Sequence, residues 1–339
     1  MPGGRGMSML PALYVSTLLA VPGINRKTAR CALGYSAEPP SSIGEMRDTL
    51  LEANARNPWV VVPSEADLAD AHERAKQELE RAEQLGLEAL VAGHEGFPGR
   101  LCSIPDAPVI LYARGNVASL ASDMSIAVAG TREPTRYGVE AAQRLGVALA
   151  QKGFTVVSGL ATGCDTAAHL GCLEAGGSTV AVLAHGLHMI YPACNRGLAD
   201  RIVRSGGCLV SEYPPGEEPR RHYFIERDRL QSGLGRAVVI VETDVEGGAM
   251  HTARFCVEQG RLLGCLVPPS RSSCDLKWQG NRELLASGKA CPLQDVRDVE
   301  TLVARLGEAS VGNAPGVPVT NDDSSYLRRQ LSLFDLGKL

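Results

Sequence analysis

The chain has 339 residues, of which 44% are hydrophobic and 21% are charged, and its formal net charge is −4. This length and composition are typical of a globular protein with one large domain or two domains. The charge excludes a histone-like protein that binds nucleic acid through overall positive charge, although it is compatible with a local basic groove. Aromatic residues make up only 4%, which excludes a dense base-stacking surface.

The cysteines and the hydropathy pattern further limit the classes of protein to which the chain can belong. Ten cysteines occur without a CxxC pair or a paired Cys/His ligand set, so we expect reduced thiols, a cytoplasmic location and no metal site. Neither a secretory leader nor an apolar run of the roughly 18–20 residues that span a bilayer is recognised. We therefore predict neither secretion nor a membrane partner.

The first quarter of the chain is predicted to be helical. Residues 1–8 are expected either to form a disordered leader or to precede a true start at Met7 or Met9. A small helical domain is expected at 9–90. Apolar patches at helical spacing occupy residues 9–37. A charged helix is expected at Ala66–Leu85, and the residues assigned to its solvated face are Glu78, Arg81 and Glu83.

A different pattern begins at Ser125, where short runs that are apolar throughout alternate with helical segments. Such runs predict strands buried on both faces, joined by helices into a parallel sheet. The expected strands are Ile126–Ala129, Thr155–Val157, Thr179–Leu183, Cys208–Val210, Ala237–Val241 and Leu262–Val267. The expected helices are Val139–Lys152, Thr166–Glu174, Arg196–Arg204 and Ala249–Gln259. The fold class is therefore α/β, a Rossmann-like, doubly wound, mostly parallel sheet at residues 91–300.

The composition changes again near residue 300. Glycine, proline, asparagine, aspartate and serine dominate Ser310–Ser325, so we predict a linker at 301–325. An amphipathic C-terminal peptide is expected at 326–339.

Three glycine-containing turns follow predicted strands, at the edge where doubly wound sheets bind ligands. They are Gly130-Thr131-Arg132, Ser158-Gly159 through Gly163, and Gly247-Gly248. Glycine lets backbone N–H groups approach an anion, and helix N-termini add partial positive charge. The turns predict a phosphate-binding edge with Arg132 as a guanidinium clamp, or, as an alternative, glycines that only cap strands and helices.

No motif predicts an enzyme or a cofactor. The chain lacks GxxxxGK[ST], and its first turn is not GxGxxG, so neither ATP hydrolysis nor dinucleotide binding is expected. Asp165, with His169 four residues later, fits a helix-capping pair better than a catalytic dyad. The remaining isolated acid–base or nucleophile candidates are Cys164, His185, Glu212 and His251.

Several longer motifs follow one another in the predicted sheet. They include VAGTREPTRYG at 128–138, VVSGLATGCDTAAHLGCLEAGG at 156–177, SEYPPG at 211–216 and FIERDRLQSGL at 224–234. In these motifs the chain resembles the DNA-processing protein A (DprA/Smf) family, over about residues 10–290. The resemblance implies a non-enzymatic protein that binds single-stranded DNA in recombination and natural transformation, assists RecA loading and forms a homodimer.

The resemblance also implies which positions bind DNA. They are Gly130, Thr131, Arg132, Ser158, Gly159, Gly163, Asp165, His169, Arg227, Arg229, Gly247 and Gly248. Two positions depart from the family pattern, because Thr162 replaces a basic residue and Asp228 replaces an asparagine. Thr162 removes a positive charge and Asp228 adds a negative one, so both are expected to weaken non-specific binding, or to select another nucleotide or polynucleotide ligand.

Two short segments suggest further contacts. Val21-Pro22-Gly23-Ile24 with Asn25 resembles a helix-hairpin-helix turn, which can contact a DNA phosphate, or a turn that only packs on the main domain. Asn25 stands where such a hairpin has a second glycine, and asparagine tolerates the left-handed conformation. The C-terminal peptide resembles motifs that dock on the DNA polymerase sliding clamp, through Gln330, Leu331, Leu333 and Phe334. A terminal helix packing back through Leu327, Leu331 and Phe334 is the alternative.

Two other functions fit parts of the sequence. One is a nucleotide-sensing or nucleotide-cleaving Rossmann domain of the lysine-decarboxylase-like group. That group carries a Pro-Gly-Gly-x-Gly-Thr turn, of which only Gly247-Gly248 is present here. The other is an adaptor to the sliding clamp.

Overall fold

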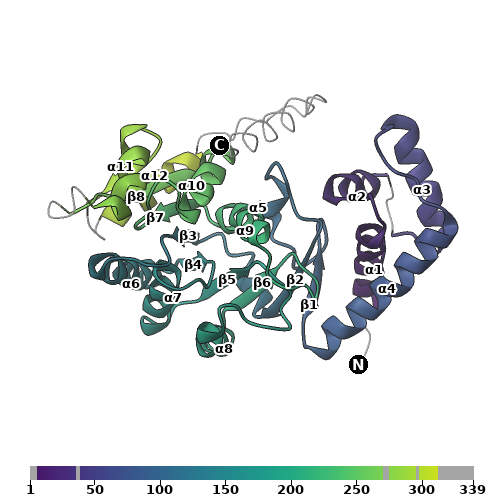
Figure 1. Ribbon diagram of the computed structural model, residues 1–339, viewed down its shortest axis with the longest axis horizontal. Coiled ribbons are helices and arrows are strands. Elements are labelled where there is room, and N and C mark those ends of the chain that lie inside the picture. The colour runs from purple at the N-terminus through teal and green to yellow at the C-terminus, as the bar shows by residue number, and fades with distance from the viewer. Residues whose placement is uncertain (1–5, 36–38, 270–274, 295–297, 312–339) are drawn as a thin grey trace, which may run out of the picture.

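The computed structural model describes residues 6–35, 39–269, 275–294 and 298–311, and it has a helical part beside a large sheet (Figure 1). The helical part contains α1 (Gly6–Ala20), α2 (Arg26–Leu33), α3 (Ile43–Arg56) and α4 (Glu65–Gln84). A helical N-terminal part was expected from the sequence, but residues 6–8 belong to α1 and not to the predicted disordered leader. Residues 301–311 of the predicted linker are likewise helical. None of the helices in these ranges is both long and apolar enough to cross a membrane.

The turn between α1 and α2 has a specific geometry. Gly23 adopts a positive φ of 87°, which only glycine reaches without strain. Asn25 has an extended backbone, and its side chain accepts a hydrogen bond from the Thr28 N–H, so it is the N-cap of α2. The expectation that Asn25 occupies a left-handed position in this turn is therefore wrong.

The strands form a mixed but mostly parallel sheet, and the doubly wound, Rossmann-like prediction is confirmed. Among the described residues the order is β1-β2-β6-β5-β4-β3-β7-β8-β9. The strands are β1 (Glu88–Val91), β2 (Ile110–Gly115), β3 (Ser125–Ala129), β4 (Thr155–Ser158), β5 (Thr179–Leu183), β6 (Cys208–Ser211), β7 (Ala237–Ile240), β8 (Leu262–Leu266) and β9 (Cys291–Leu293). Of these, only β1 with β2 and β2 with β6 pair antiparallel. The strand order reverses between β3 and β7, which makes their carboxyl ends the topological switch point.

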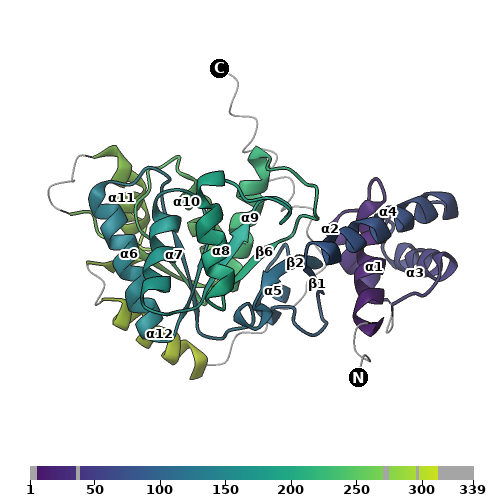
Figure 2. The same ribbon diagram turned by 90° about the horizontal axis from the view of Figure 1, so that it is seen from below.

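Helices cover both faces of the sheet. One face is covered by α6 (Arg136–Gln151), α7 (Cys164–Glu174) and α8 (Arg196–Arg204), which lie side by side in Figure 2, and by α12 (Val299–Val311). The other face is covered by α5 (Gly99–Cys102), α9 (Arg221–Leu234), α10 (Gly248–Glu258) and α11 (Gln279–Ala286). The four predicted helices match α6, α7, α8 and α10 to within three residues at each end.

Helix α9 was not predicted from the sequence. Its buried residues include Arg227, Asp228, Arg229, Gln231 and Ser232, so no apolar stripe marks the face that packs on the sheet.

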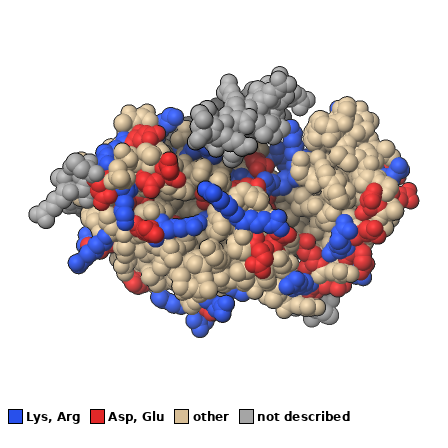
Figure 3. Space-filling model, in the orientation of Figure 1, with Lys and Arg blue, Asp and Glu red and all other residues tan. Residues whose placement is uncertain are grey.

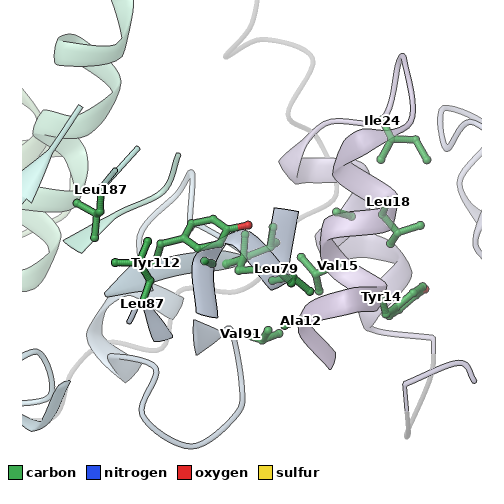
Figure 4. Close-up of a cluster of buried hydrophobic side chains, with 14 of the residues drawn as sticks. Ala12, Tyr14, Val15, Leu18, Ile24, Leu79, Leu87, Val91, Tyr112 and Leu187 are labelled. Atoms are coloured by element: carbon green, nitrogen blue, oxygen red, sulfur yellow. The ribbon is translucent and has the colours of Figure 1, made fainter. Parts of the chain in front are cut away.

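The helical part shares one hydrophobic cluster with β1 and β2. Figure 4 shows Ala12 and Val15 of α1 near Val91, Leu79 and Tyr112. Glu78, which was expected on the solvated face of α4, is instead half-buried and accepts a hydrogen bond from the Tyr112 hydroxyl. Burial raises the pKa of this carboxyl. This hydrogen bond joins α4 to the sheet.

The close approach of α6 and α7 depends on glycine. A Cβ atom at Gly171 would clash with the backbone carbonyl oxygen of Gln143, and one at Gly146 would clash with the carbonyl oxygen of Ala168. Both obstacles are backbone atoms, so neither can move aside without shifting a helix. The two glycines therefore set the distance between α6 and α7.

We expect Gly171→Ala to lower the free energy of unfolding by about 1–3 kcal/mol, because overpacking outweighs the better helix propensity of alanine. Gly197→Ala in α8 is the matched control, since no atom lies within 4 Å of its Cβ position. The control variant should be unchanged or up to about 1 kcal/mol more stable. Urea denaturation of both variants measures the difference, and equal stabilities would contradict the packing argument.

Candidate functional site

The three glycine-containing turns lie beyond the carboxyl ends of neighbouring strands. Gly130-Thr131-Arg132 follows β3, Ser158 through Gly163 connects β4 to α7, and Gly247-Gly248 connects β7 to α10. Because β4, β3 and β7 are adjacent, the structure places all three turns along one edge of the sheet, at its switch point.

The first two turns pack directly against each other. A Cβ atom at Gly163, where φ is +81°, would lie 2.5 and 2.6 Å from the carbonyl oxygens of Thr131 and Arg132. The Cys164 N–H donates to the Thr131 carbonyl oxygen at 3.2 Å, and the Thr131 N–H donates to that of Glu242 at 2.7 Å. These two N–H groups therefore form hydrogen bonds within the protein. Gly130 and Gly163 make this close backbone packing possible, while their binding to phosphate stays a prediction.

The protein supplies its own anion at the start of α6. The Glu242 carboxylate accepts hydrogen bonds from the Thr135 N–H at 3.0 Å and from its hydroxyl at 2.7 Å. Gly138 leaves room for it, because a Cβ there would clash with the carboxylate. Burial raises the pKa of Glu242. The Glu242 carboxylate therefore occupies the N-terminus of α6. This role of Glu242 was not predicted from the sequence.

Asp165 and His169 do not form the expected capping pair. The Asp165 carboxylate accepts from the Gly159 and Ala161 N–H groups at 3.1 and 3.3 Å, and so holds the turn that precedes α7. The Nδ1 atom of His169 lies 2.7 Å from the Thr179 hydroxyl. Burial and Arg227 lower the pKa of His169 to about 3, so its ring is neutral. Asp165 thus accepts backbone N–H groups, as expected of a structural role, but these groups belong to the turn before α7. His169 contacts Thr179 at the start of β5 instead of the Asp165 carboxylate.

The structure buries the two arginines of α9 that were assigned to phosphate. Arg227 is 6% exposed, donates to the Val182 carbonyl oxygen at 3.0 Å, and lies against Gly159. Arg229 is 3% exposed and pairs with Asp106 at 3.0 Å and Glu212 at 2.6 Å. Both guanidinium groups belong to internal networks, so neither is presented at the surface as a clamp.

The acidic partners of Arg229 also pair with Arg26, the first residue of α2. Arg26 pairs with Asp106, Glu212 and Glu226 at 3.1, 2.8 and 3.3 Å. The first cation of α2 therefore points to the sheet rather than to solvent.

Asp228 is buried beside Arg227, whose Nε lies 3.2 Å from its carboxylate. Burial raises the pKa of Asp228 to about 7, Asp165 adds to the rise, and Arg227 and Arg132 oppose it. Burial also raises the pKa of Asp165. Arg227 is thus paired with Asp228, and its charge also opposes the rise in the pKa of Asp165.

An exposed cation and two aromatic rings lie next to one another at this edge of the sheet. Arg132 lies 5.0 Å from the centre of the Phe224 ring, which lies 5.8 Å from that of Tyr191 in a tilted arrangement. Arg132 is exposed and Tyr191 is 43% exposed. We call Arg132, Tyr191 and Phe224 the Arg132 cluster. In such an arrangement the cation can pair with a phosphate, and the partly exposed rings can stack on a base.

Sequence reasoning missed the two rings of this cluster. Tyr191 lies in the segment between β5 and α8, and Phe224 in the first turn of α9, so only the strand order brings them to Arg132. The one signal in the sequence was Phe224 at the head of the FIERDR motif. Thr162 is exposed in the adjacent turn, without a charge. Figure 3 shows Lys and Arg interspersed with Asp and Glu, rather than one uniform basic surface.

Comparison with known sequences shows one family. The family model for DNA recombination-mediator protein A matches residues 88–304. The chain is 37% identical to protein Smf of Synechocystis over 233 residues, and 30% identical to DNA processing protein DprA of Streptococcus pneumoniae over 260 residues. These alignments cover 65% and 76% of this chain, and 58% and 88% of the relatives. The chain therefore spans less than two thirds of the Synechocystis protein.

Two solved structures are similar in fold. The X-ray structure of DprA from Streptococcus pneumoniae matches with a TM-score of 0.71 and 28% identity, covering 85% of this chain and 97% of that one. A structure of DNA processing protein A from Helicobacter pylori, described for its single-stranded DNA binding mode, matches with a TM-score of 0.58 and 27% identity. It covers 65% of this chain and 96% of its own.

The buried Asp228 carboxyl predicts a pH-dependent stability. Its folded pKa of about 7 lies above the usual value of about 3.9 in an unfolded chain. The folded state thus holds the proton more tightly, so this contribution to stability is present at low pH and is lost as the pH rises from about 4 to about 7. We expect Asp228→Asn to abolish this part of the pH dependence, because an amide does not titrate.

Urea denaturation at several pH values between about 5 and 8 measures this effect. Asp70→Asn, at an exposed position of α4, is the control and should follow the wild type. An Asp228→Asn protein with the pH dependence of the wild type would contradict the assignment.

Proposed function

The chain belongs to the DNA recombination-mediator protein A family, and on this premise we propose that it binds single-stranded DNA at the carboxyl edge of its sheet. In this proposal it handles strands during recombination or natural transformation and assists RecA loading. The Arg132 cluster carries the proposal. It supplies a cation for the backbone and rings for unpaired bases, at the switch point of a doubly wound sheet.

The cluster favours a single strand over a duplex for a physical reason. Stacking on Phe224 and Tyr191 needs an unpaired base face, which a duplex buries between its own base pairs. Base stacking tolerates any sequence, as a strand-handling protein requires.

The local charge makes binding weaker and dependent on pH. Thr162 adds no cation, and Asp228, whose charge interacts with that of Arg132, is a carboxylate with a pKa of about 7. Protonation of Asp228 removes a negative charge near the proposed phosphate position, so affinity rises as the pH falls through about 7.

The proposal is for a non-enzymatic function. His169 is buried and neutral, burial raises the pKa of the Cys164 thiol, and Glu242 is engaged by Thr135. These interactions account structurally for three acid–base and nucleophile groups of the Rossmann-like part. They also argue against the nucleotide-cleaving alternative.

Three partners extend the proposal. RecA would receive the bound strand, and a homodimer would form through the Rossmann-like part. The sliding clamp would be bound through Gln330, Leu331, Leu333 and Phe334, which lie outside the described residues. Their sequence supports docking, because apolar anchors follow a linker composition and a glutamine that can donate and accept hydrogen bonds.

Arg132→Ala should weaken binding to labelled oligo-dT severalfold and flatten the slope of log K against log salt by about 0.7 for each phosphate that Arg132 neutralises. Phe224→Ala should also weaken binding but leave the slope unchanged, because a ring releases no counterion. Fluorescence anisotropy over a salt series, with the matching duplex as competitor, measures both effects.

Arg204→Ala is the matched control for Arg132→Ala. Arg204 ends α8 next to the start of β6, at the opposite edge of the sheet, and is exposed. Its removal should leave affinity unchanged. Wild-type affinity in Arg132→Ala would overturn the site.

The clamp proposal has its own test in the full chain. The double variant Leu333→Ala, Phe334→Ala should no longer bind purified sliding clamp, measured by surface plasmon resonance, and should keep wild-type affinity for oligo-dT. Arg132→Ala should show the reverse. If the tail variant is inactive in cells while Arg132→Ala is active, the chain is an adaptor to the clamp instead.

A further inference from the structure

A second cation–aromatic surface lies on the helical part, far in sequence from the Arg132 cluster. Trp59, between α3 and α4, is 46% exposed, and the ammonium of Lys27 on α2 lies 5.0 Å from the centre of its ring. The chain has one other tryptophan, Trp278, which is fully buried. An exposed indole beside a cation is a surface on which an unpaired base can stack.

A second pair of the same kind lies beside the first. The Arg56 guanidinium is 5.5 Å from the centre of the Tyr35 ring. Asn57 donates a hydrogen bond from its side chain to the Tyr35 hydroxyl at 2.9 Å, and its carbonyl oxygen accepts from the Val60 N–H at 2.9 Å. The segment that carries Trp59 is thereby fixed next to Tyr35. We call Lys27, Tyr35, Arg56 and Trp59 the Trp59 surface.

The charges of this surface suit a polyanion. Lys27, Arg30 and Arg56 are exposed cations on α2 and α3. Glu52 pairs with Arg56 at 3.8 Å, but both side chains are more than half exposed, so the pair contributes little and leaves Arg56 free to pair with a phosphate. Alternating cations and rings can pair with phosphates while unpaired bases stack.

The ion network connects this surface to the Arg132 cluster. Arg26, the neighbour of Lys27, pairs with Glu226, which follows Phe224 by two residues in α9. Figures 1 and 2 both show α2 on the side of the helical part that faces the sheet. A single strand that leaves the Arg132 cluster along α9 can therefore reach α2.

We propose that the Trp59 surface is a second binding site for single-stranded DNA, in which bases stack on Trp59 and Tyr35 and phosphates pair with Lys27 and Arg56. This inference rests on the proposed function, since the same strand occupies both sites. A strand long enough to span them binds more tightly than a short one.

Tryptophan fluorescence of the full chain tests the inference directly. Trp278 is buried and cannot stack on a base, so quenching by unlabelled oligo-dT that is lost in Trp59→Phe reports on Trp59. We expect a long oligo-dT to quench the fluorescence, and Trp59→Phe to abolish the quenching. Trp59→Ala should weaken binding of the long strand about fivefold or more, while a short oligo-dT that fills only the Arg132 cluster keeps its affinity.

Charge variants give a second readout that needs no change in an aromatic ring. Lys27→Glu should weaken binding of the long strand and flatten its salt dependence. Lys289→Glu is the matched control, because Lys289 is exposed just before β9, at the amino edge of the sheet.

Fluorescence anisotropy of a labelled strand under the same conditions separates the two proposals. Binding without quenching, and with wild-type affinity in Trp59→Ala and Lys27→Glu, would overturn the second site and leave the proposed function intact. The absence of any binding would overturn the proposed function itself.

Discussion

The burial of two arginines in α9 is the constraint on which the rest of the edge depends. A buried guanidinium must be paired, and removing one partner typically costs about 3–5 kcal/mol. Arg227 is surrounded by Asp228 and Asp165, and Asp165 in turn holds the Gly159–Ala161 backbone. The turn after β4 is therefore fixed by a charge that the solvent does not reach.

Arg229 has the same role toward the helical part. Its partners Asp106 and Glu212 are also the partners of Arg26 on α2. One helix thus positions the turns of the sheet on one side and the N-terminal helices on the other. The hydrophobic cluster around Tyr112 adds buried area between the two parts, whereas the arginines specify their geometry.

The sequence was most informative where a segment is buried on both sides. The runs at β3, β5 and β7 are almost entirely apolar, so their strand character and the parallel sheet follow directly. In α9 many of the buried residues are polar, so the spacing of apolar residues along the helix does not predict which face packs on the sheet. The Arg132 cluster could not be predicted from the sequence for a different reason. Its three residues lie far apart in the chain, and they are seen to be neighbours only once the strand order is known.

The close packing of the two glycine turns has a consequence for protein engineering. A side chain at Gly130 or Gly163 would collide with neighbouring atoms of the turns, and Gly159 is closed by Arg227. Thr162, however, is exposed and Thr131 partly so. Thr131 and Thr162 are therefore the positions of these two turns that can be randomised, whereas the glycines at 130, 159 and 163 resist substitution.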